Sequence, residues 1–595
     1  MRFYRILFTA LSIVFGLSVS AQVDLTSQRR EVQTFQKVPG HKVDHKGLII
    51  NPVPHILSTD TLKRFNIANG FKPNAAMLTD FSGDFTTLNI PTSDKGVAII
   101  ADYGAKIAAR KGVKLLKGAY KLGLNKKGVE IAAYDKSGVF YALQTLRQLI
   151  DSPIASDGTL PGIEINDWPD LPYRGVVEGF YGTPWSHDVR LSLIDFYGRN
   201  KMTDYIYGPK DDPYHSSPNW RKPYPADQAK NIAELVEACK KNHVNFVWAI
   251  HPGKDIRWDK ADYDSLVAKF DMMYDLGVRS FALFFDDIRG KGTDSNMQTK
   301  LVNDLTRDFV NAKGDVSNLM VCPTDYTELW ANPAPDGQLA VYGEKLDSCV
   351  EVFWTGATVC SDLTPATLNF VNSRIKRPAL FWWNFPVTDY CPEIILQGPV
   401  YGLDTNLSSI DVAGVISNPM ENGEASKLAL YGVADYAWNI AGYNPIDNWE
   451  RSLTLLVPEA SDAYRRFAIH SADTQSGYRR DESWETDIFS YDNYTPEQFD
   501  ALRDEMQRIT EVPAQMQLIS NKALLKELNP WLTEFGKLGE RGLRTLDLIK
   551  VYESGDPTAL WAEYVKNIMT PSDIQAYNAH KSGTMKLQPF YENTM

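Results

Sequence analysis

The chain has 595 residues, of which 44% are hydrophobic and 23% are charged. This is the composition of a globular protein long enough for about two to four domains. The formal net charge of −12 argues against a nucleic-acid partner or an anionic membrane surface. An acidic polysaccharide remains possible as a ligand, because a protein with a negative net charge can still contain a locally basic groove.

The N-terminus predicts a signal peptide over residues 1–21. Arg2 and Arg5 precede an apolar run at 6–19, and small residues end at Ala21, the expected cleavage point. The run is short for a membrane span, and no cysteine follows the cleavage point to suggest a lipid anchor. We therefore expect an exported bacterial protein, periplasmic or secreted, that is not inserted in the membrane.

The cysteines do not predict a disulfide framework, although export would permit one. They are few, odd in number and irregular in spacing: Cys239, Cys322, Cys349, Cys360 and Cys391. We expect most of them to be buried thiols.

Residues 22–168 read as a small α/β domain. Two short strands at 120–124 and 129–134, joined by a turn containing glycine, predict a hairpin. Apolar residues at helical spacing predict a helix over 139–150. The stretch 151–172 is rich in Pro, Gly and Asp, and we interpret it as a linker.

From residue 173 the pattern changes to short apolar strands that alternate with helices. Eight strands are expected, at 173–178, 203–207, 245–250, 280–285, 319–322, 351–354, 379–383 and 414–417. Helices are expected between them, including 189–200, 226–242, 263–276 and 300–312. Such alternation over about 250 residues predicts a (β/α)8 TIM barrel, which we assign to residues 169–445.

The remainder, 446–595, predicts a helical bundle beside the barrel. Residues 496–509 and 531–549 carry apolar positions at helical spacing. No chemistry is assigned to this region.

The fourth predicted strand carries the most informative feature, in VRSFALFFDDIRG (278–290). The apolar run 281–285 ends in two carboxylates, Asp286 and Asp287. Charges beside apolar surface lose hydration, and the C-terminal end of a barrel strand is where active sites lie. One Asp here could simply cap a helix, but two in succession favour a functional pair. Adjacent carboxylates repel, so we expect one pKa to rise; these residues alone do not say which.

The other strand ends place aromatic, amide, lysine and carboxylate side chains on the same rim. They follow the strands as 179–185, 208–212, 251–253, 322–326, 355–356, 382–389 and 418–419. Aromatic faces beside hydrogen-bonding groups suit a sugar, which has apolar C–H faces and a ring of hydroxyls.

These motifs resemble glycoside hydrolase family 84, the retaining β-N-acetylglucosaminidases that include O-GlcNAc hydrolases. The resemblance covers the barrel and, more loosely, both flanking domains. It is carried in order by GVVEGFYGTPW (175–185), YIYGPKDDPYH (205–215), FVWAIHPG (246–253), FALFFDDI (281–288), VCPTDY (321–326), WTG (354–356), WWNFPVTDY (382–390) and SNPMENGEASK (417–427).

The resemblance implies substrate-assisted hydrolysis of terminal β-linked GlcNAc, including O-GlcNAc on Ser or Thr of proteins, through an oxazoline, without a cofactor or metal. Asp286 would polarise the 2-acetamido group and Asp287 would be the general acid and then the general base. An ordinary retaining pair lies about 5–5.5 Å apart on opposite faces of the sugar, which adjacent residues cannot easily achieve. Substrate-binding roles would fall to Gly179, Tyr181, Lys210, Cys322, Tyr326, Trp382, Asn384, Asp389 and Asn418.

Two alternatives remain open. Asp211, Asp212, His215 and His251 could form the metal set of a deacetylase or hydrolase, although no HxxH or HExxH spacing supports it. A non-catalytic carbohydrate-binding protein would need the aromatic residues but not the Asp pair. The sequence does not reveal the oligomeric state, or which GlcNAc-bearing glycan or glycoprotein is the natural substrate.

Overall fold

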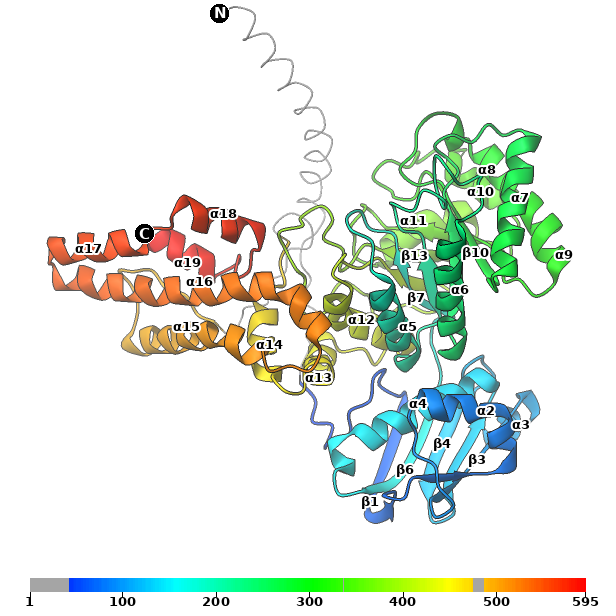
Figure 1. Ribbon diagram of the computed structural model, residues 1–595, viewed down its shortest axis with the longest axis horizontal. Helices are drawn as coiled ribbons and strands as arrows, with labels where there is room; N and C mark the ends of the chain where they lie inside the picture. The colour runs from blue at the N-terminus through cyan, green and yellow to red at the C-terminus, as the bar shows by residue number, and fades with distance from the viewer. Residues whose placement is uncertain (1–41, 335, 475–485) are drawn as a thin grey trace, which may run out of the picture.

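The computed structural model describes residues 42–334, 336–474 and 486–595. The predicted signal peptide lies outside these residues. An N-terminal α/β domain (blue) lies against a barrel (green), and a helical region (orange to red) extends away from the barrel (Figure 1). The predicted class, a TIM barrel with a small α/β domain before it and helices after it, is confirmed.

The N-terminal domain is a six-stranded sheet in the order β1-β6-β4-β5-β3-β2, partnered by helices. The predicted hairpin is confirmed as the antiparallel pair β4–β5, and the predicted helix is α4. The elements are β1 (Ile56–Asn66), β2 (Phe71–Pro73), α2 (Ala75–Thr87), β3 (Val97–Tyr103), α3 (Ala105–Lys111), β4 (Tyr120–Asn125), β5 (Gly128–Ala133), α4 (Lys136–Asp151), η1 (Pro153–Ala155) and β6 (Thr159–Asp167).

The prediction of a linker over 151–172 is wrong, because its central part is strand β6, paired with both β1 and β4. Pro161 and Gly162 made this stretch look like a turn. Both lie opposite an irregularity in β1, and pairing with β4 begins only at Ile163, so the missing N–H of Pro161 costs no ladder bond to β4. Leu160, Ile163 and Ile165 are buried in the domain core.

All eight predicted barrel strands are present and close in the order β10-β11-β12-β13-β14-β7-β8-β9. Apolar side chains such as Val247, Ala282 and Leu380 fill the barrel interior. The strands are β7 (Tyr173–Glu178), β8 (Asp204–Tyr207), β9 (Asn245–Ile250), β10 (Ser280–Phe284), β11 (Met320–Cys322), β12 (Glu351–Trp354), β13 (Ala379–Trp383) and β14 (Val412–Ser417).

Helices surround the barrel, and the four predicted ones are present. The segment predicted as one helix over 300–312 is divided, because a π-helical turn, η3 (Thr306–Val310), interrupts it. The surrounding elements are α5 (His187–Arg199), α6 (Ala226–Lys241), α7 (Lys260–Asp275), η2 (Gly290–Thr293), α8 (Ser295–Leu305), α9 (Asn311–Lys313), α10 (Gln338–Lys345), α11 (Pro365–Ile375) and α12 (Gly423–Trp438).

The C-terminal region is helical, as predicted, and is built on the long helix α16. Gly539 and Gly542 of α16 let α15 approach closely, since an added Cβ would come within 3 Å of Met506 at either position. Within the described residues, no helix is both long and apolar enough to cross a bilayer. The helices are α13 (Pro445–Leu456), α14 (Ser461–Ile469), α15 (Pro496–Met516), α16 (Lys522–Ser554), α17 (Pro557–Asn567), α18 (Pro571–Ala579) and α19 (Leu587–Thr594).

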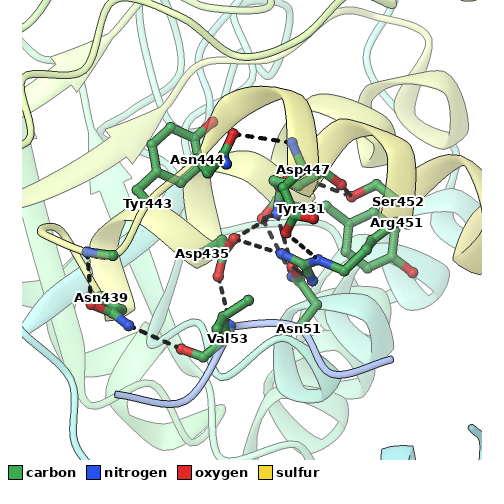
Figure 2. Close-up of polar contacts among 12 residues, drawn as sticks. Asn51, Val53, Tyr431, Asp435, Asn439, Tyr443, Asn444, Asp447, Arg451 and Ser452 are labelled. Carbon is green, nitrogen blue, oxygen red and sulfur yellow. Dashed lines mark hydrogen bonds and ion pairs between the residues drawn. The ribbon is translucent and has the colours of Figure 1, made fainter. Parts of the chain in front are cut away.

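A buried ion-pair network ties the segment before β1 to α12 and α13 (Figure 2). The Arg451 guanidinium donates to Asp435 and Asp447, each at 3.0 Å, and to the carbonyl of Ile50 at 2.7 Å. Val53 N–H donates to the other Asp435 oxygen at 2.6 Å. Because these charges are buried, each depends on its partners.

A second buried pair joins the N-terminal domain to the base of the barrel. Lys201, which precedes β8, and Asp167, at the end of β6, are both fully buried, and their charged atoms are 3.4 Å apart. Tyr120 and Trp438 also donate to Asp167. The two domains therefore share a polar interior as well as apolar contacts.

We expect Arg451→Met to lower the free energy of unfolding by about 3–5 kcal/mol, because two buried carboxylates lose their counter-ion. Differential scanning fluorimetry should show a clear fall in melting temperature. Arg544→Met is the control, since Arg544 and Glu540 form an exposed pair and its loss should leave the melting temperature unchanged. Equal effects in the two variants would contradict the importance of the Arg451 network.

Candidate active site

A cavity of about 480 Å³ opens at the C-terminal ends of the barrel strands. The eleven residues singled out in the sequence all line it: Gly179, Tyr181, Lys210, Asp286, Asp287, Cys322, Tyr326, Trp382, Asn384, Asp389 and Asn418. They come from six of the eight strand ends, so barrel closure brings them together from 240 residues of sequence.

Asp286 follows β10 and is only 5% exposed. Its Oδ2 accepts a hydrogen bond from Lys210 Nζ at 2.7 Å. Its Oδ1 is buried and has no hydrogen-bond donor among the described residues. Burial alone would raise the pKa of this carboxyl, but the Lys210 ammonium, with His251, outweighs burial and holds the pKa well below its usual range. The pKa of Asp286 is therefore lowered rather than raised.

Lys210 follows β8, and its ammonium lies between Asp286 and the ring of Tyr181, whose centroid is 5.1 Å away. Burial opposes the charge on Lys210, but the Asp286 carboxylate outweighs it and holds the pKa of the ammonium above its usual range. Two charges that are costly to bury separately thus keep each other ionised.

Asp287 differs from its neighbour, because it is exposed and its backbone is left-handed, with a φ of 51°. Short polar residues such as Asp adopt this conformation more readily than other non-glycine residues, and it turns the chain sharply at the strand end. The Asp287 carboxylate accepts hydrogen bonds from the Tyr181 hydroxyl at 2.8 Å and the Tyr326 hydroxyl at 2.7 Å.

Side-chain amides and an indole form another part of the cavity lining. Asn384 Oδ1 accepts from Asn418 Nδ2 at 2.8 Å and from Trp382 Nε1 at 3.0 Å. Gly179 has no room for a side chain, because a Cβ would lie 2.7 Å from the Trp382 ring. This wall is consequently held rigid by its own hydrogen bonds and packing.

Asp389 and Cys322 complete the predicted set. Asp389 Oδ2 accepts from the backbone N–H of Tyr181 at 3.0 Å, which links the loops after β13 and β7. Burial, reinforced by the nearby Asp286 carboxylate, raises the pKa of the Cys322 thiol well above its usual range. Cys322 therefore lies in the cavity as a thiol rather than as a nucleophilic thiolate.

Several contacts were not foreseen from the sequence. Trp330 is 40% exposed and packs edge-on against Tyr326, with ring centroids 5.1 Å apart. His251 contacts Asp286, although the sequence suggested only a metal role for it. For both Trp330 and His251, the only indication in the sequence of a place near the cavity was a position after a predicted strand. The cavity is also lined by Thr355, Val359, Cys360, Val387 and Tyr390.

Two residues of the metal alternative, Asp212 and His215, have other partners. The Asp212 carboxylate accepts hydrogen bonds from two tyrosine hydroxyls, and His215 Nδ1 donates to a main-chain carbonyl. In the described part of the chain, no three His, Cys, Asp or Glu side chains are grouped so that they could hold a metal ion.

A barrel whose mouth presents adjacent carboxylates among aromatic rings and amides has the architecture of a glycoside hydrolase. Three family profiles match the chain. They are described as beta-N-acetylglucosaminidase (residues 174–469), glycosyl hydrolase family 20, domain 2 (72–168), and bacterial GH84, post-catalytic domain (484–593).

Individual relatives agree with these profiles. The protein O-GlcNAcase of Mus musculus is 32% identical over 271 residues, which are 44% of this chain but only 29% of the mouse protein. The structure of CpGH84B superposes with a TM-score of 0.81 at 28% identity, over 92% of this chain and 100% of that one. A mutant of the Thermobaculum terrenum O-GlcNAc hydrolase gives a TM-score of 0.62 at 26% identity, covering 71% and 94%. The chain belongs to glycoside hydrolase family 84.

We expect Lys210→Met to raise the pKa of Asp286, because burial then acts without the opposing ammonium. A carboxyl titration of Asp286 by NMR should show the midpoint moving to higher pH. If the variant is active, the acidic limb of its kcat/KM profile should move the same way. Lys260→Met, which removes an exposed pair on α7, is the control and should leave the midpoint unchanged. An unchanged midpoint in Lys210→Met would contradict this account of Asp286.

Proposed function

We propose that this protein is a retaining β-N-acetylglucosaminidase that removes terminal β-linked GlcNAc by substrate-assisted catalysis. The nucleophile is the carbonyl oxygen of the substrate's own 2-acetamido group, and the intermediate is an oxazoline. Support comes from family membership, from the names of the matched relatives and from the different environments of the two carboxylates.

The observation that carries the proposal is the state of Asp286. Lys210 keeps this buried carboxylate ionised through Oδ2. Oδ1 accepts no hydrogen bond from the described residues, although His251 Nε2 lies 3.4 Å away. A buried carboxylate oxygen without a donor is unfavourable until a donor arrives. The acetamido N–H of the substrate supplies one, and its polarisation by the negative charge makes the acetamido oxygen more nucleophilic.

Asp287 acts as the general acid and then as the general base. It adjoins Asp286 in the chain, so the two cannot easily flank a sugar ring as an acid and an enzymic nucleophile do. Its exposure and left-handed backbone suit a group that faces the leaving group and then solvent water. The hydroxyls of Tyr181 and Tyr326 orient its carboxylate.

The reaction balances in two steps. First, the acetamido oxygen forms a bond to C1 as the C1–O bond to the leaving group breaks, and Asp287 gives its proton to the departing oxygen. Then Asp287 takes a proton from water, whose oxygen bonds to C1 as the oxazoline C1–O bond breaks. Configuration at C1 is inverted twice and therefore retained.

The remaining cavity residues recognise the sugar. Lys210, Asn384 and Asp389 present charged or amide groups to hydroxyls, and Gly179 contributes its backbone. Trp382, Cys322, Tyr326 and Asn418 surround the acetamido group, and Tyr181 lines the site. We further propose that the protein is exported, periplasmic or secreted, and that its substrates are GlcNAc-bearing glycans or glycoproteins. The proposed domain boundaries lie near residues 168 and 445.

The direct test is hydrolysis of a chromogenic β-N-acetylglucosaminide by the purified protein. Activity that survives a chelator would separate this proposal from the metal-dependent alternative, which requires inhibition. Binding without turnover would favour a carbohydrate-binding protein and overturn the proposal.

We expect Asp287→Ala to discriminate between leaving groups. A glycoside with a poor leaving group needs the proton, so its rate should fall by the ~10²–10⁴-fold that general acid catalysis typically provides. A stable phenolate needs no proton, and its release should be much less impaired. The two rates are compared as kcat/KM; equal losses would mean that Asp287 is not the acid.

Fluorination of the acetyl methyl group tests the nucleophile. Each fluorine withdraws electrons from the acetamido oxygen while changing its shape little, so kcat/KM should fall steeply along the mono-, di- and trifluoro series. Asp286→Asn should slow every leaving group, unlike the Asp287 variant. A flat series, or a glycosyl group trapped on an Asp, would rule out the substrate-assisted route even in an active enzyme.

A further inference from the structure

His251 lies directly after β9, beside the end of β10 that carries the Asp pair. It is 4% exposed. Its Nε2 is 2.8 Å from the main-chain oxygen of Asp286 and 3.4 Å from Oδ1 of the same residue. A carbonyl oxygen only accepts hydrogen bonds, so Nε2 of His251 carries the proton.

The carbonyl that His251 binds belongs to the peptide group joining Asp286 to Asp287. On the far side of that peptide, Asp287 has its left-handed φ of 51°. Such a conformation costs about 1–3 kcal/mol and persists only where surrounding contacts impose it. Rotation of this peptide group would redirect both carboxylates at once, since it moves the carbonyl end of one residue and the amide end of the next.

His251 is itself firmly held. Its backbone N–H donates to the carbonyl of His215 at 2.8 Å, and the two rings pack edge to face with centroids 6.4 Å apart. His215 Nδ1 donates in turn to the Ala249 carbonyl. The Nδ1 of His251 is buried without a partner in the described residues, so the contact with Asp286 determines which nitrogen is protonated.

We propose that His251 is a positioning residue, which fixes the peptide group between Asp286 and Asp287 and thereby the relative orientation of the two carboxylates. The inference rests on the proposed function, in which both carboxylates act on the substrate. It assigns His251 itself no contact with the sugar. Lys210 holds the side chain of Asp286, and His251 holds its main chain.

The test compares His251→Leu with His251→Gln. Leucine fills space but cannot donate, so kcat should fall by about 10²-fold, the cost of a misplacement near 1 Å. KM should change little, because the residues that bind the sugar hydroxyls are untouched. Glutamine places an N–H close to the position of Nε2 and should restore most of kcat. His470→Leu, which removes a buried imidazole beside α14, controls for lost stability and should leave kcat unchanged.

Two results would overturn the proposal: a kcat for His251→Leu within about twofold of wild type, or an equal loss in His251→Gln. Should the leucine variant not fold, the NMR measurement on the wild type still tests the contact. A second measurement does not depend on activity. Long-range ¹H–¹⁵N NMR of the histidine-labelled wild type should find His251 protonated on Nε2, and protonation on Nδ1 would refute the contact. A wild type inactive on β-N-acetylglucosaminides would instead refute the proposed function.

Discussion

The ion pair between Lys210 and Asp286 combines two groups that would each be expensive to bury alone. A lone carboxylate at this depth would take up a proton, and a lone ammonium would lose one. Together, 2.7 Å apart, both remain charged inside a cavity lined by aromatic rings. The barrel thus keeps a full negative charge where water does not screen it, which makes that charge effective on whatever group binds beside it.

The two carboxylates are adjacent in sequence, but the backbone between them gives them different surroundings. Asp286 ends a buried strand and is fixed by Lys210 and His251, whereas Asp287 turns outward with a left-handed backbone and meets two tyrosine hydroxyls. Asp286 is therefore buried and ionised, whereas Asp287 is exposed to solvent. A single strand end can therefore supply two groups with separate chemical duties.

The barrel was predictable because its strands are short apolar runs followed by polar loops, and the cavity residues followed from the motifs at those loops. The linker prediction failed because Pro161 and Gly162 carry a turn signal that a bulge in the partner strand accommodates. The contacts of Lys210 and His251 with Asp286 join three different strand ends, and no local pattern reports such distances. The burial of Arg451 could not be predicted from the sequence either, because a charged residue on an amphipathic helix ordinarily faces water.

Strand β8 has a lysine–aspartate pair at each end, and the two aspartates come from different domains. Lys201, before the strand, pairs with Asp167 of the N-terminal domain, and Lys210, after it, pairs with Asp286. Lys201, at the base of the barrel, and Lys210, at its mouth, are only about nine residues apart in the chain. The N-terminal domain, which contributes no residue to the cavity lining described above, therefore supplies the counter-ion at the end of β8 opposite Lys210. Loss of the Asp167 carboxylate would therefore leave the Lys201 ammonium buried without its counter-ion, at the end of β8 opposite the cavity.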